Sequence, residues 1–226
     1  MTVFATCPPP PGGGSFVEGG ADVRLFERIA CDLETKGHCL YTGGLSAALE
    51  VTLQDQVADI PQREFRPARI GRQETRQKNN RVRRDKISWI TGERPAGRAW
   101  LDWADALQLY LNRRLFLGLT SFESHYARYE EGDFYRRHLD AFPGDANRVL
   151  SLVAYLNRDW QPGDGGELLL YPGGPAQAPV AVAPLFGTLA IFLSEEMPHE
   201  VLPCRSERLS IAGWFRVRPL DVPPVL

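Results

Sequence analysis

The sequence is poor in cysteine and in long apolar runs, and both shortages narrow the possible kinds of protein. Its four cysteines form no Cys-x-x-Cys pair and no framework spacing, which argues against a structural zinc site and against a disulfide scaffold. No stretch is long and apolar enough to span a membrane, and the first 20 residues lack the basic start and apolar run of a secretory signal. We therefore expect reduced thiols in a soluble protein of the cytoplasm, with no membrane partner.

An excess of charge of either sign is also absent. The chain has 26 Lys and Arg against 28 Asp and Glu, a formal net charge of −2, which argues against affinity of the whole protein for nucleic acid. With 226 residues and 43% hydrophobic content, the chain can bury a sizeable core, and its length fits one domain better than two. We predict a flexible lead-in over residues 1–20, with an uninterrupted Pro/Gly run at 8–14, and a single domain over 21–226, for which we favour a monomer.

Helical periodicity dominates the N-terminal half of the chain. Apolar residues recur every three to four positions over 21–36 and again over 45–58, which predicts two amphipathic helices that each bury one face. The same periodicity returns over 100–115. Together these segments form a helical support, which we place at residues 21–60 and 97–116.

The stretch 63–86 is the most polar part of the chain. It is rich in Lys and Arg and contains turn signals at Gly71 and at Asn79-Asn80. We predict two strands joined by an exposed basic finger, followed by a half-buried strand over residues 86–90.

From residue 121 onward the pattern changes to strand and turn. Short apolar or alternating runs are separated by Gly, Pro and Asp, as in proteins built from many short strands. The candidate strands are 124–129, 134–138, 149–156, 167–171, 188–193, 199–202 and 209–217. We therefore predict an α+β fold with a double-stranded β-helix, or jelly-roll, core over residues 121–218 and with the helices packed on one face.

Three residues in the last part of the chain could hold a metal ion. His138 and Asp140 are two positions apart, so on a strand both would point to one face while Leu139 turns away. His199 begins a distant predicted strand, after Pro198, and would complete the set. Two imidazoles and one carboxylate on one side of a metal leave its other positions open, which is the arrangement of non-haem iron(II) oxygenases. His-x-Asp alone arises easily by chance, so its order relative to the later residues matters.

Arg208 begins the last predicted strand, where Ser210 and Trp214 share its face. An inward-facing guanidinium needs a carboxylate, and its planar fork suits a two-pronged grip on a dicarboxylic acid such as 2-oxoglutarate. The alternative is an ion pair within the protein, with Glu167 or Glu207.

Two tyrosines and two further histidines need separate interpretations. Tyr129 and Tyr155 lie on predicted strands that flank the His-x-Asp pair, and either hydroxyl could bond to the same carboxylate. The alternative for each is a core residue whose hydroxyl is satisfied elsewhere. His38 and His125 have no acidic partner at strand or helix spacing, so we predict that neither binds a metal.

Several segments in a fixed order carry a family resemblance. Tyr129 is followed by Gly132, and the other segments are DKISWITG at 85–92, YRRHLD at 135–140, YLNRDW at 155–160, GGEL at 165–168, PHEVLP at 198–203 and RLSIAGWF at 208–215. In these residues the chain resembles the 2-oxoglutarate- and iron(II)-dependent prolyl hydroxylases, most closely the prolyl-hydroxylase-domain type, and among those a bacterial member. The resemblance spans about residues 84–218.

The resemblance implies a role for each of the residues that match. It implies iron ligation by His138, Asp140 and His199. Residues expected to bind or border 2-oxoglutarate are Arg208, Tyr155, Tyr129, Trp214 and Ser210. Residues expected to contact the substrate are Arg148, Arg76 and Arg81.

The implied reaction is hydroxylation of a prolyl residue in a protein. It would use Fe²⁺, 2-oxoglutarate as cosubstrate and L-ascorbate as reductant, consume O2, and release succinate and CO2. The substrate would present its proline in an exposed loop, and bacterial-type relatives suggest a translation factor. The finger at 63–86 matches the position of a loop that closes over a peptide, and its alternative is a merely solvated hairpin.

Two other functions remain open at this stage. One is oxidation of a free amino acid or another small molecule, against which the long basic finger speaks mildly. The other is a nucleic-acid-binding or demethylating module whose finger contacts phosphates. Phe65 is the only aromatic residue of the finger, which is poor for base stacking, so we expect no nucleic-acid partner.

Overall fold

The computed structural model describes residues 20–68, 81–141, 147–173 and 177–218. The predicted lead-in at 1–20 lies outside these ranges except for Gly20, and so does the tip of the basic finger. The helices are α1 Gly20–Lys36, α2 Ala47–Asp59 and α3 Pro95–Leu115, with a short 3-10 turn, η1, at Gln62–Glu64. The strands are β1 His38–Thr42, β2 Arg66–Pro67, β3 Lys86–Trp89, β4 Ser121–Tyr129, β5 Tyr135–His138, β6 Arg148–Tyr155, β7 Leu168–Leu170, β8 Val180–Val182, β9 Thr188–Leu193, β10 His199–Val201 and β11 Arg208–Arg216.

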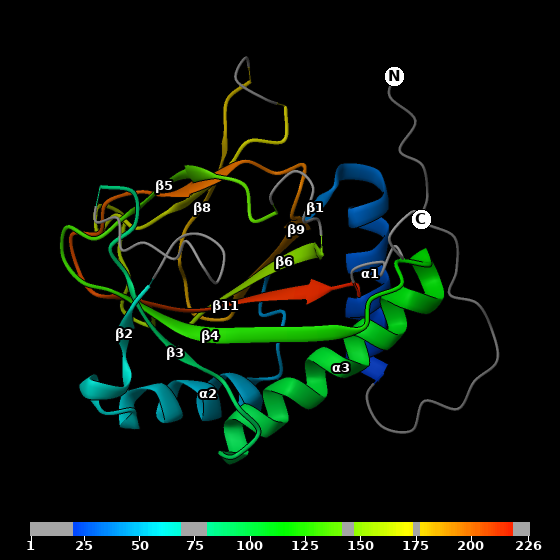
Figure 1. Cartoon of the computed structure of the whole chain (residues 1–226), viewed down its shortest axis with the longest axis horizontal. Helices are drawn as coiled ribbons and strands as arrows, with labels where there is room; N and C mark the ends of the chain where they lie inside the picture. Colours follow the sequence, from blue (N-terminus) through cyan, green and yellow to red (C-terminus); the bar gives the residue numbers. More distant parts are fainter. Residues whose placement is uncertain (1–19, 69–80, 142–146, 174–176, 219–226) are drawn as a thin grey trace, which may run out of the picture.

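The strands form two antiparallel sheets. The larger sheet has the order β1-β9-β6-β11-β4-β3-β2, and the smaller has the order β5-β10-β7-β8. A cluster of buried side chains draws on both sheets, with Tyr129 and Phe192 from the larger and Leu170 and Val182 from the smaller. In Figure 1 the smaller sheet lies above the larger one and the helices lie on the other side. The predicted α+β jelly roll with helices on one face is confirmed.

Local signals explain where the helices begin and end. Gly37 follows α1 with a φ of 71°, and its N–H donates to the Leu33 carbonyl, as a glycine cap does. The Ser46 side chain accepts a hydrogen bond from the Leu49 N–H at the start of α2. The third helix begins at Pro95, before the predicted start at residue 97, because proline is well tolerated in the first helical turn.

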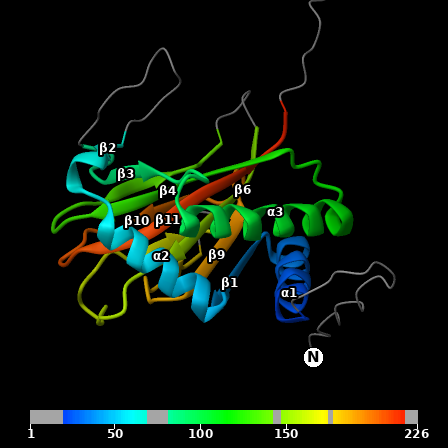
Figure 2. The ribbon, with the colours of Figure 1, turned by 90° about the horizontal axis from the view of Figure 1, so that it is seen from below.

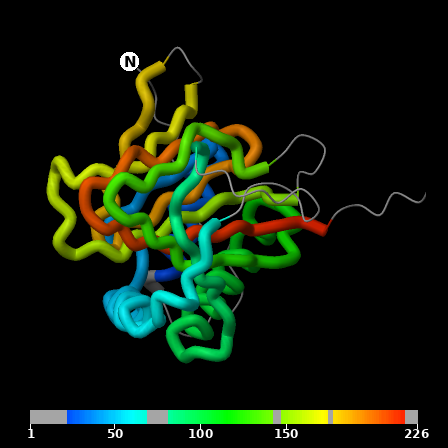
Figure 3. The backbone as a smooth tube through the Cα atoms, turned by 60° about the vertical axis from the view of Figure 1, so that its left-hand side comes forward, coloured from blue at the N-terminus to red at the C-terminus, as the bar shows by residue number. Residues whose placement is uncertain are grey.

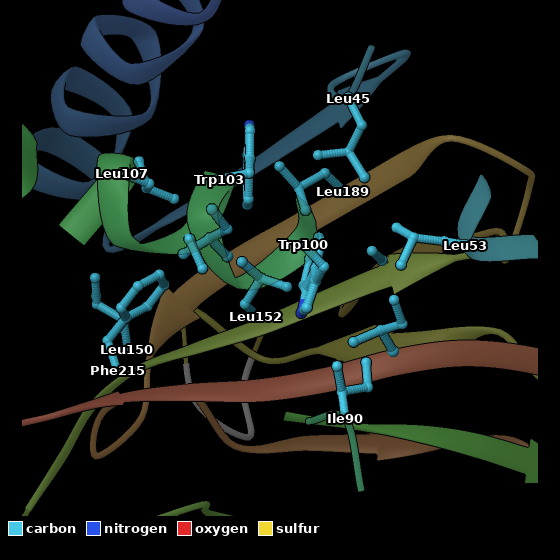
Figure 4. Packing of buried hydrophobic residues seen from close by; sticks show 14 of the residues in the cluster. Leu45, Leu53, Ile90, Trp100, Trp103, Leu107, Leu150, Leu152, Leu189 and Phe215 are labelled. Carbon is cyan, nitrogen blue, oxygen red and sulfur yellow. The ribbon is translucent and has the colours of Figure 1, made fainter. Parts of the chain in front are cut away.

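The helices cover one face of the larger sheet. Figure 2 shows α2 and α3 running across that face, with α1 beside α3. Trp100 of α3 is fully buried, its ring is stacked 5.3 Å from that of Trp103, and its Nε1–H donates to the Ser124 hydroxyl at 2.9 Å. Figure 4 shows Trp100 among leucines from α2 and the sheet, such as Leu53 and Leu152. This core fixes the larger sheet from behind, so the opposite face is free to build a pocket.

Replacing Trp100 with alanine is expected to lower the free energy of unfolding by about 3–5 kcal/mol, because it leaves a cavity in the core and removes the donor to Ser124. Urea unfolding followed by circular dichroism measures the loss. Leu109→Ala is the matched control, since Leu109 lies on the same helix and is 46% exposed. Equal losses for the two variants would contradict this description of the core.

The finger region differs in detail from the predicted pair of strands. In the described part, the short strand β2 pairs with β3, joining Arg66 to Ile87 and Pro67 to Lys86. The segment just before β3 bridges instead to β5, through Arg83 and Tyr135. Figure 3 shows this segment passing beside the strand that ends at His138. The base of the finger therefore joins the two sheets at the rim of the molecule.

None of the described helices has both the length and the apolar run needed to cross a lipid bilayer.

Candidate metal centre and adjoining pocket

His138, Asp140 and His199 converge on one point at the open end of the smaller sheet. His138 ends β5 and His199 begins β10, and the two are direct partners in the antiparallel ladder. Asp140 Oδ1 lies 3.5 Å from His138 Nε2, and Asp140 Oδ2 lies 3.5 Å from His199 Nε2. One ligand atom from each residue lies within 4.8 Å of the others. The predicted set of three is therefore brought together.

The local reason for this convergence differs from the predicted one. We expected His138 and Asp140 on a single strand, but β5 ends at His138 and Asp140 lies in the bend that follows. The bend turns the carboxylate back across the His138–His199 pair, so strand periodicity alone does not place it.

Hydrogen bonds to the backbone set the orientation of both imidazoles. His138 Nδ1 lies 2.8 Å from the Arg136 carbonyl, and His199 Nδ1 lies 2.9 Å from the Met197 carbonyl. A carbonyl oxygen only accepts, so each Nδ1 carries the proton and each Nε2 presents a lone pair toward Asp140. This outer support is typical of histidines that bind metals.

The protonation states also suit a metal. Burial opposes charge on Asp140, yet the imidazoles of His199 and His138 hold the pKa of its carboxyl well below the ordinary value. Burial lowers the pKa of His199 to about 4, with Asp140 acting in the opposite direction. At neutral pH the group therefore offers an anionic carboxylate and a neutral His199 ring, which are the forms that bind a divalent cation.

Two buried serines extend this group away from the pocket. Ser151 of β6 donates from its hydroxyl to Asp140 Oδ2 at 2.7 Å, and its Oγ lies 2.8 Å from the Ser194 hydroxyl. Both serines are almost fully buried. Neither was among the predicted site residues, because a single serine on a strand has no distinguishing pattern.

A pocket of about 50 Å³ opens beside these residues. Its lining includes His138, Asp140, His199, Arg208, Ser210 and Trp214. Arg208 of β11 is 2% exposed, donates from Nε to the Gly166 carbonyl and from Nη1 to the Ser210 hydroxyl, both at 2.9 Å. Gly166 has a φ of 74°, and a Cβ there would lie 2.9 Å from Arg208 Cδ, so only glycine lets the arginine lie this close.

The alternative partners of Arg208 are not used. Glu207 pairs with Arg128 at 3.5 Å, and Arg208 has no ion pair with any carboxylate in the described part of the chain. A buried guanidinium is costly without an anion. Its position beside the pocket therefore indicates that an external carboxylate binds there.

The two predicted tyrosines lie on either side of Arg208. Its guanidinium carbon is 4.8 Å from the Tyr129 ring centroid and 5.0 Å from that of Tyr155. Tyr129 lines the pocket. The Tyr155 hydroxyl is buried and has no hydrogen-bond partner among the described residues, and burial raises its pKa. A neutral, unpartnered phenol beside Arg208 is a donor waiting for an acceptor.

Two pocket residues were missed by the sequence interpretation. Tyr135 stacks on the His138 ring at 3.5 Å between centroids, and Arg83 lies over the other ring, 4.7 Å from the Tyr135 centroid. Both line the pocket. Tyr135 is three residues before His138, so a regular strand would place them on opposite faces. The ladder with β10 is irregular between these residues, and this bulge turns both side chains inward.

Arg83 is itself held by Asp85. Arg83 Nε lies 2.5 Å from one Asp85 carboxylate oxygen and Nη2 lies 2.8 Å from the other, and Asp85 is 1% exposed. This bidentate pair fixes one wall of the pocket.

The remaining predicted residues lie at the edge of the site or outside it. Trp214 lines the pocket, and its buried Nε1–H has no partner among the described residues. Arg148 lies behind it, 3.8 Å from its ring centroid, paired with Glu123 at 3.2 Å. Arg81 is exposed, and its carbonyl accepts from Arg136 Nε. Arg76 lies outside the described residues.

Neither of the other two histidines joins the group. His38 Nδ1 contacts the Lys36 carbonyl. His125 is buried against Trp89 and Trp214, and burial lowers its pKa to about 4. In the described part of the chain the three-ligand group contains only His138, Asp140 and His199, so neither histidine takes part in it.

Comparison with known proteins gives the family. The sequence pattern of the 2OG-Fe(II) oxygenase superfamily matches residues 124–216. The crystal structure of a Pseudomonas putida prolyl-4-hydroxylase is similar with a TM-score of 0.78 and 40% identity, over 86% of this chain and 100% of that one. The chain belongs to the 2OG-Fe(II) oxygenase superfamily. The predicted family and the predicted kind of enzyme, a 2-oxoglutarate-dependent dioxygenase, are confirmed.

Other relatives of this oxygenase carry similar names. A prolyl hydroxylase from Trichoplax adhaerens, solved with a hypoxia inducible factor peptide fragment, has a TM-score of 0.77 and 30% identity over 86% of this chain and 90% of that one. Human Egl nine homolog 1 is 34% identical over 144 residues, which are 59% of this chain and 33% of that protein. The chain therefore spans about a third of the length of this curated relative.

The cofactors of the family fit the residues present in this oxygenase. Fe²⁺ and 2-oxoglutarate match the convergent histidines and aspartate, the buried Arg208 without a carboxylate, and the unpartnered Tyr155 hydroxyl. The predicted cofactors are thus supported by both the family and the site, and ascorbate is typical of the prolyl hydroxylases that it resembles.

Proposed function

We propose that this oxygenase hydroxylates a prolyl residue in a protein substrate, using Fe²⁺, 2-oxoglutarate and O2 and releasing succinate and CO2. The observation that carries the proposal is the placement of a buried arginine without a protein carboxylate beside a His-Asp-His group in one pocket. The relatives named above, which are prolyl hydroxylases, favour proline over other substrates.

Each part of the site has a distinct task in this proposal. His138, Asp140 and His199 would hold the iron, which together with 2-oxoglutarate supplies the oxidising power that places one oxygen atom of O2 on a carbon of the substrate. Arg208 binds the distal carboxylate of 2-oxoglutarate through the N–H groups that Gly166 and Ser210 leave available. The Tyr155 hydroxyl donates to the same carboxylate.

The pocket walls would orient the target. Tyr129 and Trp214 present aromatic surfaces that a proline ring can pack against, and Trp214 offers a buried N–H that lacks an acceptor. Arg148 supports the far side of Trp214. The apolar lining also limits access of water to the reacting centre.

Removal of the Ser151 hydroxyl is expected to weaken Fe²⁺ binding by about 10- to 100-fold, since Asp140 Oδ2 would lose its donor and its fixed orientation. Anaerobic titration of the metal-free protein measures the affinity of Ser151→Ala without turnover. The matched control is Ser124→Ala, another buried serine, which bonds to Trp100 and should lower stability alone. Wild-type metal affinity in Ser151→Ala would contradict the assignment.

The finer proposal concerns the partner and its location. We propose a monomeric enzyme of the cytoplasm whose substrate presents its proline in an exposed loop, with a translation factor as the first candidate. Static light scattering tests the monomer. Cell fractionation tests the location.

Mass spectrometry of a cell lysate tests reaction and partner together. The lysate is incubated with the enzyme, Fe²⁺ and ascorbate, with and without 2-oxoglutarate. We expect a single-oxygen addition on a proline of one protein, present only with 2-oxoglutarate. Succinate release with no modified protein would contradict the proposal and indicate a small-molecule substrate.

A further inference from the structure

The bulge that shapes the pocket also creates a basic surface beside it. Tyr135 pairs with Val201 and His138 pairs with His199, so Arg136 and Arg137 together oppose a single residue of β10. The two inward side chains line the pocket, whereas both arginines are exposed. One irregularity in the sheet thus builds a catalytic wall on one side and a pair of adjacent cations on the other.

The neighbouring segment adds to this surface. Arg84 is exposed and its N–H donates to the Phe134 carbonyl, while the Arg136 N–H donates to the Val82 carbonyl. Arg136 Nε also donates to the Arg81 carbonyl at 2.7 Å. We call the exposed arginines of this region, Arg81, Arg84, Arg136 and Arg137, the rim patch.

Aromatic rings hold three of these arginines in place. The guanidinium carbons of Arg84 and Arg136 lie 5.1 Å and 5.4 Å from the Phe134 ring centroid, and that of Arg137 lies 3.8 Å from the Tyr171 centroid. A guanidinium resting on a ring keeps its in-plane N–H donors for a carboxylate and loses little freedom on binding one. The rim patch is therefore organised before any partner arrives.

Nearby carboxylates do not neutralise the rim patch. Glu130 pairs with Lys86 at 2.6 Å, and Glu200 accepts from the Tyr171 hydroxyl. Arg136 and Arg137 have no ion pair within the described residues, where Glu131 is the remaining exposed acid of the β4–β5 turn. The patch keeps a positive charge that the fold does not use.

The position of the rim patch connects it to the substrate. Arg137 directly precedes His138, and Arg84 directly follows Arg83, which lines the pocket. A polypeptide whose proline enters the pocket brings its flanking residues to this rim. We propose that the rim patch binds acidic residues that flank the target proline in the protein substrate, an inference that rests on the proposed function.

An acidic polypeptide fits the patch better than RNA does. Single-stranded RNA is bound by basic grooves whose aromatic rings are open for stacking on bases. Here the Phe134 and Tyr171 rings already carry guanidinium groups. The patch thus offers charge without a stacking platform, which matches a run of Asp or Glu.

Equilibrium binding tests the inference without requiring turnover. Fluorescence anisotropy is measured at low salt for three labelled probes and the full chain: a peptide with one proline flanked by glutamates, the same peptide with lysines, and a single-stranded RNA of equal length. We expect the glutamate peptide to bind about 10-fold more tightly than the lysine peptide. The preference should vanish in Arg84→Ser/Arg137→Ser and reverse in Arg84→Glu/Arg137→Glu.

A charge-matched control separates the patch from overall charge. Arg63 of η1 and Arg98 of α3 are exposed on the helical side, so Arg63→Glu/Arg98→Glu should leave the preference for the glutamate peptide unchanged. Equal binding of the two peptides, tighter binding of RNA, or an equal effect of the control would overturn the inference. Mass spectrometry of the bound glutamate peptide reports separately on the proposed function: bound but unhydroxylated peptide contradicts that function and leaves the rim patch supported.

Discussion

Replacement of His199 by alanine is expected to reduce 2-oxoglutarate-dependent succinate formation by more than about 100-fold, because an inner ligand should matter more than the outer partners, whose loss costs about 10- to 100-fold. His199 is buried, its Nδ1–H is held by the Met197 carbonyl, and no described residue could replace its Nε2 beside Asp140. Succinate measured by chromatography over the same incubation gives the activity. Anaerobic Fe²⁺ titration of the variant should show a parallel loss of affinity.

His38→Ala is the control for this substitution. His38 also contacts a backbone carbonyl through Nδ1, but it lies on β1 outside the three-ligand group. Its variant should keep wild-type activity and metal affinity. Retention of full activity by His199→Ala, with circular dichroism showing a folded protein, would remove His199 from the metal site.

Replacement of Arg208 by lysine should weaken 2-oxoglutarate binding by about 10- to 100-fold, the effect of losing charge-assisted hydrogen bonds. Lysine keeps the charge, but a single ammonium cannot bond to Gly166, to Ser210 and to a carboxylate with the geometry of a planar fork. Isothermal titration of the Mn²⁺-loaded protein with 2-oxoglutarate measures the affinity without turnover.

The comparison variant for Arg208→Lys is Arg114→Lys. Arg114 of α3 pairs with Glu27 at 3.2 Å, on the helical side of the larger sheet. The affinity for 2-oxoglutarate should be unchanged in this variant. If Arg208→Lys also bound 2-oxoglutarate with wild-type affinity, the buried guanidinium would have another role.

Much of the fold was predictable because the local patterns and the tertiary packing agree. The strand predicted at 188–193 is β9, Thr188–Leu193, and the helix predicted at 21–36 is α1 within one residue. Strand β8 was missed, since its three residues lie between Pro179 and Pro184 in a stretch that is typical of a loop. It becomes a strand only because β7 offers a ladder beside it.

The candidate site was predictable where residue chemistry is distinctive and less so where position depends on backbone irregularity. Histidine, aspartate and arginine in a fixed order indicated an iron site with a carboxylate grip. Strand periodicity placed Tyr135 on the wrong face, since the bulge against β10 shifts it into the pocket. The Arg83–Asp85 pair was missed for a similar reason, because its segment bridges to β5 and not to β3.

Isotope labelling tests the central claim most directly. The purified enzyme, Fe²⁺, ascorbate and 2-oxoglutarate are incubated with the protein identified in the lysate under isotopically labelled dioxygen, and the peptides are analysed by mass spectrometry. The account predicts one labelled oxygen atom on a single proline, absent in Asp140→Ala. Unlabelled proline alongside continued succinate formation would contradict prolyl hydroxylation by this site.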